Sequence, residues 1–260
     1  MQKGILLVAF GSSVPAANVA LKNIHHEVER SFPGVMIRWA YTSAFIRKKL
    51  KRQGDEVDSP VIALSKMADE GCTHIAIQSL HTIPGLEYEY LLQTVKGIMD
   101  IPKGPVKVEV GRPLLYSHED VERAVDAMMA HIPHRGEREG LVLMGHGTPH
   151  FSNVFYPALN YYFAQKTHTV FVATVEGFPT IQDIILKLKQ QKIDKVYLMP
   201  FMSMAGGHVK NDMCGEHEGS WCTLLISAGF KVECIIKGTG ELKEMVSIWL
   251  QHLKDAFERL

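Results

Sequence analysis

The chain has 260 residues, of which 46% are hydrophobic and 22% charged, with 28 Lys and Arg balanced by 28 Asp and Glu. This composition is typical of a folded globular protein and excludes a disordered chain, while the zero formal net charge provides no general attraction to nucleic acid or to an anionic membrane surface. Four cysteines are too few for a disulfide framework, and the 13 histidines direct attention to metal binding.

The N-terminal apolar run covers residues 5–10 and ends at Gly11-Ser12-Ser13. Six apolar residues are too few for the hydrophobic region of a signal peptide, which needs roughly 7–15. No apolar stretch approaches the roughly 20 residues of a transmembrane helix. We therefore predict a first buried strand here, and we expect a cytoplasmic protein without a membrane partner.

Short apolar runs alternate along the chain with longer amphipathic segments. This alternation predicts an α/β fold with doubly wound parallel sheets and crossover helices. Several of the runs are apolar throughout, as expected of strands covered on both faces. The expected strands span residues 5–10, 35–40, 74–78, 106–110, 141–144, 169–173, 195–199 and 231–235. The expected helices span residues 17–30, 61–70, 88–99, 119–130, 180–190 and 241–259.

A weak internal repeat divides the chain into two similar α/β halves. Residues 6–13 resemble residues 142–149, because both place a glycine and hydroxyl residues just after an apolar strand. The charged stretch with Pro and Gly at residues 131–139 separates the two halves. We predict an N-terminal half at 1–134 and a C-terminal half at 135–260, with the active site in the cleft between them.

Three successive strands of the second half are each followed by a potential metal ligand. His146 lies between two glycines, Glu176 precedes a Gly-Phe-Pro turn, and His208 follows two glycines. Each residue alone has an ordinary structural explanation, such as a local hydrogen bond or a helix N-terminus. Because the carboxyl ends of parallel strands share one edge, however, the three together predict a site for divalent Co, Fe, Ni or Zn that leaves coordination positions open for a substrate.

A rival metal site is formed in the sequence by His208, Cys214, His217 and Cys222. These residues would offer the mixed His and Cys ligands of a structural zinc site. Their separations of six, three and five residues match no usual zinc spacing, so this alternative is disfavoured.

Four motifs, taken in order, resemble the anaerobic sirohydrochlorin cobaltochelatases of the CbiK type, which belong to the class II tetrapyrrole chelatases. The motifs are Gln78-Ser-Leu-His-Thr-Ile-Pro-Gly-Leu-Glu-Tyr-Glu89, Met144-Gly-His-Gly-Thr148, Val175-Glu-Gly-Phe-Pro179 and Ala205-Gly-Gly-His-Val-Lys-Asn-Asp-Met213. The resemblance extends from Phe10 to Trp221. Each motif is weak alone, but their order and spacing together are specific.

The resemblance implies two flavodoxin-like halves, no organic cofactor, and insertion of Co²⁺ into sirohydrochlorin with release of two protons in anaerobic cobalamin biosynthesis. It also implies that His146, Glu176 and His208 bind the metal and that Glu87 faces the macrocycle. We expect His146 and Glu87 to act in catalysis, with Glu87 accepting the pyrrole protons. The family often self-associates, so a homo-oligomer is compatible with the resemblance.

A tetrapyrrole with several carboxylates requires a local positive surface on a chain without net charge. Arg47 and Lys48 lie in the densest basic run, which extends to Arg52. This run either forms a solvated helix face or steers the substrate. We also expect Ser12 and Ser13, just after the first strand, to contact the substrate.

Three alternatives stay open at this stage. The first is a chelatase that delivers Fe²⁺ and makes sirohaem or haem, since this chain has Leu86 and Gly207 where family members often carry acidic residues. The second is a non-catalytic haem- or metal-binding protein that uses the same histidines. The third, a flavodoxin-like nucleotide-binding protein, is disfavoured because Gly11-Ser12-Ser13 lacks a phosphate-binding glycine pattern.

Overall fold

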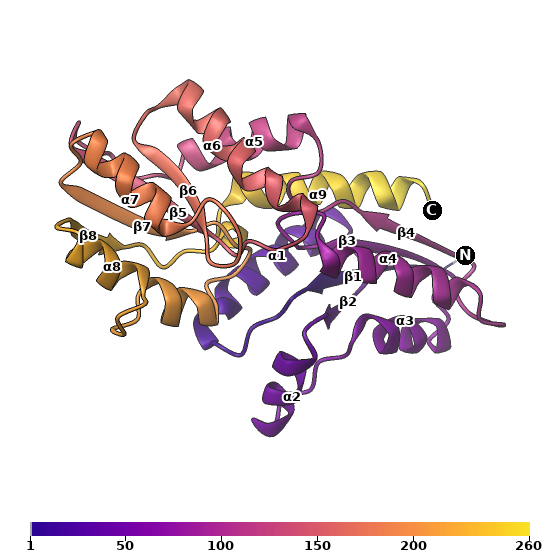
Figure 1. Cartoon of the computed structure of the whole chain (residues 1–260). Helices are drawn as coiled ribbons and strands as arrows, with labels where there is room; N and C mark the ends of the chain where they lie inside the picture. Colours follow the sequence, from indigo (N-terminus) through magenta and orange to yellow (C-terminus); the bar gives the residue numbers. More distant parts are fainter. Residues whose placement is uncertain (1) are drawn as a thin grey trace. The chain divides into compact units, whose positions relative to one another are not determined.

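The computed structural model describes residues 2–260, which form two four-stranded parallel sheets flanked by helices (Figure 1). The expected α/β fold class is confirmed, and all eight expected strands are present within two residues of their predicted ranges. The strands are β1 (Lys3–Ala9), β2 (Met36–Tyr41), β3 (His74–Ser79), β4 (Lys107–Gly111), β5 (Glu139–Gly145), β6 (Val170–Thr174), β7 (Lys195–Pro200) and β8 (Lys231–Cys234). The helices are α1 (Asn18–Ser31), α2 (Ala44–Arg52), α3 (Pro60–Asp69), α4 (Leu86–Met99), α5 (His118–Met129), α6 (Phe155–Lys166), α7 (Ile181–Gln190), α8 (Trp221–Ser227) and α9 (Lys243–Glu258). Shorter turns are η1 (Pro15–Ala17), η2 (Phe151–Val154), the π-helical η3 (Val209–Met213) and η4 (Thr239–Glu241).

Both sheets have the same strand order, in agreement with the internal repeat. The first is ordered β2-β1-β3-β4 and the second β6-β5-β7-β8, and neighbouring strands are parallel throughout. The direction of winding reverses between β1 and β3 in one sheet and between β5 and β7 in the other. Open α/β sheets bind ligands beyond the carboxyl ends of the strands at this reversal. The loops after β5 and β7 therefore occupy the favoured position for a site in the second sheet.

The contacts of the chain define two compact units that are not contiguous in sequence. One contains residues 2–13, 22–116 and 246–260, and the other contains residues 14–21 and 117–245. The predicted boundary between residues 134 and 135 separates the same two sheets. It does not anticipate that most of α9 belongs with the first sheet, because amphipathic periodicity shows that a helix has an apolar face but not which sheet covers that face.

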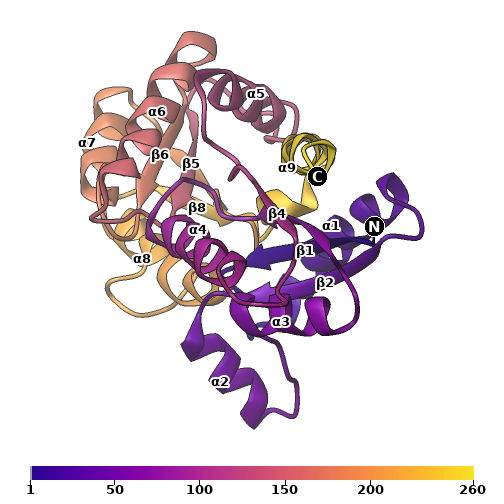
Figure 2. The ribbon, with the colours of Figure 1, turned by 90° about the vertical axis from the view of Figure 1, so that its right-hand side faces the viewer.

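In the first unit, helices cover both faces of the sheet. Leu6 of β1 packs in one cluster with Leu64 of α3 and Leu91 of α4, and these two helices lie on the same side of the sheet (Figure 2). On the other side, Phe32 directly after α1 and Phe257 of α9 have ring centroids 4.8 Å apart. Because β1 is covered from both sides, it is buried from its second residue to its last.

In the second unit, one face of the sheet is covered by α7, α8 and η3. Met144 of β5 lies in one buried cluster with Ile184 of α7, Val209 of η3 and Leu225 of α8. Helix α6 packs on β6, and α5 packs on α6. The segment η3 is thus anchored in the core directly after the position of His208.

Two helices of the second unit, α6 and α8, were not among the expected elements. Helix α6 carries aromatic side chains on its exposed as well as its buried side, for example exposed Tyr161 and buried Phe163, so it lacks a clear apolar stripe. Helix α8 has only seven residues, which is too short for a periodic pattern. No helix among residues 2–260 has the length and apolar character needed to cross a bilayer.

Candidate functional site

His146 lies on a tight loop directly after β5. A Cβ atom at Gly145 would lie 2.3 Å from the ring of Tyr156, and the backbone N–H groups of His146 and Gly147 donate hydrogen bonds to the hydroxyl of that tyrosine. Burial raises the pKa of Tyr156 to about 12, although these N–H groups act in the opposite direction. At Gly147, φ is +78° and a Cβ atom would lie 2.0 Å from the carbonyl oxygen of Glu176, so this close approach requires glycine.

Glu176 is joined to the His146 loop through its main chain. The N–H group of Glu176 donates to the carbonyl of His146 at 2.7 Å, and the N–H group of Val175 donates to the carbonyl of Gly145 at 3.1 Å. These bonds extend the pairing of β5 and β6 beyond the ends of both strands. The side chain of Glu176 is exposed. The main chains of these two predicted ligands are therefore adjacent, with the carboxylate of Glu176 accessible to solvent.

His208 follows β7 and directly precedes η3. Its Nδ1 atom lies 2.7 Å from Oδ2 of Asp212. Its ring packs edge-on against the ring of His146, with centroids 4.6 Å apart and planes at 90°. The structure thus brings together the two imidazoles that the sequence placed after separate strands.

Both imidazoles use Nδ1 for a local hydrogen bond. The partner of His146 is the carbonyl oxygen of Gly147 at 2.9 Å, and the partner of His208 is the carboxylate of Asp212. Carbonyl and carboxylate oxygens accept hydrogen bonds, so Nδ1 carries the proton in both rings. In this tautomer the lone pair that can bind a metal is on Nε2.

Within residues 2–260, no group of three His, Cys, Asp or Glu side chains is placed to hold a metal ion. The two imidazoles form a pair, and the side chain of Glu176 is not part of a ready-made triad with them. The rival His/Cys set is likewise not assembled as a metal site. Its members Cys214 and Cys222 pack as partly buried apolar side chains against the core of the second unit. The set of His146, Glu176 and His208 stays a prediction.

The buried amide of Asn153 connects the two loops of this region. Its Oδ1 atom accepts a hydrogen bond from the N–H group of Thr148 at 3.1 Å, and its Nδ2 atom donates to the carbonyl of Phe178 at 2.7 Å. Asn153 therefore fixes the loop that follows His146 against the loop that follows Glu176. Asn153 could not be predicted from the sequence, because its partners are main-chain groups, which leave no motif.

Three of the residues predicted in the first unit follow β1 and β3. Ser12 is buried and Ser13 is partly buried just after β1. Glu87 lies in the first turn of α4, where the helix dipole favours a carboxylate. These positions follow the two strands at which the strand order of the first sheet reverses. Their roles in substrate binding and proton transfer stay predictions.

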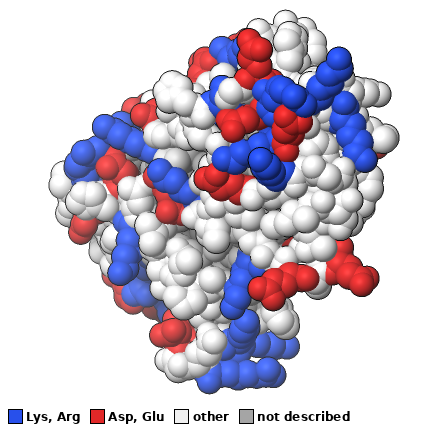
Figure 3. Space-filling view, turned by 90° about the vertical axis from the view of Figure 1, so that its left-hand side faces the viewer, with Lys and Arg blue, Asp and Glu red and all other residues white. Residues whose placement is uncertain are grey.

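The predicted basic run forms much of helix α2. Arg47 donates hydrogen bonds to the carbonyls of Tyr41 and Thr42, which anchors the helix to the end of β2. Lys48 and Arg52 are exposed, and Figure 3 shows Lys and Arg gathered at the lower end of the view, where α2 lies. Arg47 thus stabilises the helix, whereas Lys48 and its exposed neighbours face solvent.

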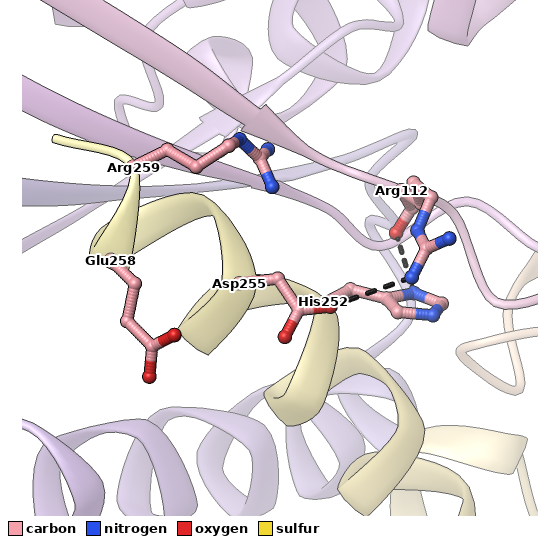
Figure 4. Close-up of a pocket in the computed structure, with 5 residues that line it drawn as sticks. All are labelled: Arg112, His252, Asp255, Glu258 and Arg259. Atoms are coloured by element: carbon pink, nitrogen blue, oxygen red, sulfur yellow. Dashed lines mark hydrogen bonds and ion pairs between the residues drawn. The ribbon is translucent and has the colours of Figure 1, made fainter.

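A pocket of about 500 Å³ on the first unit lies at the C-terminal part of α9 (Figure 4). It is lined by Arg112, His252, Asp255, Glu258 and Arg259. Its charges are largely paired, since Arg112 lies 3.4 Å from Asp255 and Arg259 donates to Glu109 at 2.9 Å. Because it contains none of the predicted site residues, we interpret this pocket as a surface ion-pair network.

His81, in the loop after β3, is partly buried. Its Nδ1 atom lies 2.8 Å from Oγ of Ser79, and its carbonyl accepts a hydrogen bond from Nε1 of Trp249 at 3.4 Å. Its Nε2 atom is buried and has no hydrogen-bond partner among the described residues. Burial lowers the pKa of His81 from 6.5 to about 4.

This lowered pKa predicts a loss of stability in mild acid. Between pH 6.5 and about 4 the unfolded chain binds a proton at His81 that the folded chain does not, so stability falls as the pH decreases. We expect the wild type to lose about 2–3 kcal/mol more than His81→Asn between pH 7 and 4.5. Urea unfolding at both pH values measures this difference, and equal losses in the two proteins would contradict it.

Two other histidines of the second unit have local structural roles. Nδ1 of His150 accepts a hydrogen bond from the N–H group of Ser152 and caps η2. His118, at the start of α5, is exposed, hydrogen-bonds to Tyr162 and lies 3.7 Å from Glu122.

Comparison with known proteins identifies the family of the chain. A family model described as "Cobalt chelatase (CbiK)" matches residues 3–258. The sirohydrochlorin cobaltochelatase CbiKC of Nitratidesulfovibrio vulgaris is 39% identical over 260 residues, which cover all of this chain and 92% of that protein. The sirohydrochlorin cobaltochelatase of Salmonella typhimurium is 32% identical over 260 residues, which cover 98% of this chain and 97% of that protein.

Solved structures share the fold at much lower sequence identity. The sirohydrochlorin chelatase SirB from Bacillus subtilis subspecies spizizenii, in complex with cobalt, has a TM-score of 0.63 at 13% identity and covers 100% of this chain and 97% of its own. CbiX, described as the terminal enzyme of sirohaem biosynthesis in denitrifying bacteria, has a TM-score of 0.54 at 15% identity, with 97% and 99% covered. The family match over residues 3–258 and the 39% identity over the full chain confirm the resemblance seen in the four motifs: the chain belongs to the cobalt chelatase (CbiK) family.

Proposed function

We propose that this chain inserts Co²⁺ into sirohydrochlorin, the activity for which its curated relatives from N. vulgaris and S. typhimurium are named. Two pyrrole N–H protons leave and one divalent metal enters, and no organic cofactor takes part. The product is then an intermediate of cobalamin biosynthesis. The observation that supports this function best is the contact between His146 and His208, whose rings lie 4.6 Å apart beyond the switch-point strands β5 and β7.

In this proposal, Nε2 of His146 and Nε2 of His208 bind the metal, and Glu176 completes the set. The main chain of Glu176 is bonded to that of His146 at 2.7 Å, and its side chain is exposed. Two imidazoles and one carboxylate suit borderline divalent metals and leave coordination positions open. A site of this kind can release the metal to the macrocycle, whereas a set of four thiolates would retain it.

Glu87 is the proposed acceptor of the pyrrole protons. A general base must reach the proton that it removes and must be ionised when it acts. Glu87 lies in the first turn of α4, directly after the loop that follows β3.

The test is a metal-insertion assay with purified protein, sirohydrochlorin and either Co²⁺ or Fe²⁺, followed by visible absorption. We expect the spectrum of the metallated product to develop at a rate proportional to enzyme concentration, and faster with Co²⁺ than with Fe²⁺. A preference for Fe²⁺ would instead indicate a ferrochelatase. Binding of the tetrapyrrole without metal-dependent turnover would indicate a non-catalytic binding protein.

The exposed lysines of α2 are proposed to steer the carboxylates of the substrate. Lys48→Glu/Lys49→Glu is expected to raise the KM for sirohydrochlorin roughly 3- to 10-fold at low ionic strength, with a smaller effect in added salt. The matched control is Lys187→Glu/Lys189→Glu, which makes the same charge change on exposed positions of α7. If the two double variants change the KM equally, or if neither changes it, α2 is a solvated helix face without a role in steering the substrate.

A further inference from the structure

Asp212 contacts the Nδ1 edge of His208 in the proposed metal site. The Nδ1 to Oδ2 distance is 2.7 Å, within the range of a charge-assisted hydrogen bond. Because an ionised carboxylate can only accept, the proton of the imidazole is held on Nδ1. The Nε2 atom of His208 then keeps the lone pair that the metal requires.

The π-helical turn η3 fixes the positions of His208 and Asp212 relative to each other. Val209 and Met213 are buried in the core of the second unit, and the N–H group of Cys214 donates to the carbonyl of Val209 at 3.1 Å, which closes the wide turn. His208 and Asp212 stand four residues apart on this frame, with side chains 38% and 35% exposed. Single π-helical turns are frequent at functional sites. Here the turn directs an imidazole and its carboxylate partner to one side.

The imidazoles of His146 and His208 are oriented by different kinds of hydrogen-bond acceptor. His146 donates its Nδ1 proton to a main-chain carbonyl, that of Gly147, at 2.9 Å, whereas His208 depends on a side chain. A carboxylate behind a ligating imidazole fixes the ring and makes it a stronger donor to the metal. Since η3 supplies no main-chain carbonyl to Nδ1 of His208, removal of the carboxylate leaves this ring without its orienting partner.

We infer that Asp212 is a positioning residue for Co²⁺: it holds the ring of His208 so that Nε2 is presented to the metal beside His146. This inference rests on the proposed function, because it takes His208 as a metal ligand. Asp212 touches neither the metal nor the macrocycle in this role.

The experiment uses the whole chain and Co²⁺ alone as the probe. Co²⁺ affinity is measured by isothermal titration calorimetry, and coordination by the visible d–d absorption of bound Co²⁺. The variants are Asp212→Ala, Asp212→Asn and His208→Ala. The matched control is Glu218→Ala, which removes an exposed carboxylate from the neighbouring loop. Circular dichroism melting confirms that each variant is folded, and Asp212→Asn, with nearly unchanged volume, serves if Asp212→Ala does not fold.

We expect Asp212→Ala to weaken Co²⁺ binding about 10- to 100-fold and to alter the visible band. Asp212→Asn keeps an oxygen acceptor at the same place, so it should recover most of the affinity, and Glu218→Ala should bind as the wild type does. If His208→Ala abolishes Co²⁺ binding, His208 is a ligand. In that case, equal losses of affinity in Asp212→Ala and Asp212→Asn, or no loss in either, would overturn the positioning role of Asp212. Normal binding by His208→Ala would overturn the proposed metal site itself.

Discussion

Replacement of His146 by alanine is expected to reduce Co²⁺ insertion by more than about 100-fold, because the loss of an outer partner of a metal ligand alone costs about 10- to 100-fold and the loss of the ligand removes more. The same result is expected for His208→Ala, since the two rings lie 4.6 Å apart and neither can bind the metal in the same geometry alone. Initial rates of insertion, with sirohydrochlorin saturating and trace metals removed, measure the effect.

The appropriate control is His118→Ala. His118 lies in the same unit and is an exposed imidazole on α5, so this variant removes a histidine outside the proposed site. We expect it to insert Co²⁺ at the rate of the wild type. A normal insertion rate in both His146→Ala and His208→Ala would contradict the assignment of the metal site.

Replacement of Trp249 by alanine is expected to lower the free energy of unfolding by about 3–5 kcal/mol, the usual cost of truncating a large buried aromatic side chain. Trp249 is 1% exposed, and its Nε1 atom donates to the carbonyl of His81 at 3.4 Å. The variant therefore leaves a cavity in the first unit and removes one of two hydrogen bonds to the carbonyl of His81, which still accepts from the N–H group of Leu114 at 3.0 Å. Urea unfolding followed by circular dichroism measures the loss.

Two further variants test the cause of this loss. Trp249→Phe retains most of the apolar volume, so it should lose about half as much or less. Phe45→Ala removes an aromatic ring that is 73% exposed and should change stability by no more than about 0.5 kcal/mol. A loss of less than about 1 kcal/mol in Trp249→Ala would contradict the packing of α9 against the first sheet.

The eight strands could be predicted because most of them leave a strong local signal, although β8 is exposed or partly buried along its length. Parallel strands covered on both faces are short apolar runs, and turn residues mark their ends. The amphipathic segments α4, α5 and α7 left an equally clear helical period. Helices α6 and α8 were missed for local reasons, since one carries aromatic residues around its circumference and the other is only seven residues long.

The candidate site was predictable in part. His146 and His208 stand beside glycines just after their strands, and the common edge of a parallel sheet is enough to predict that they meet. The sequence also predicted that the main chain of Glu176 lies at this edge of the sheet. It could not predict the orientation of the exposed side chain of Glu176. Arg47 was placed among the substrate-binding residues because of its charge, yet its hydrogen bonds to Tyr41 and Thr42 give it a structural role that charge alone does not reveal.

By itself, the sequence determined the α/β class, the repeat of four strands and the membership of the chelatase family. It also determined that the two imidazoles follow strands of the same sheet. All of these features depend on local order along the chain. Only the tertiary structure decided that most of α9 belongs to the first unit, that Asn153 joins two loops of the second, and that Asp212 holds the ring of His208. The physical reason is the same in each case. An apolar helix face can pack on many surfaces, and an amide or a carboxylate can form hydrogen bonds with many groups. Which of these groups lies close enough is decided by the folded chain.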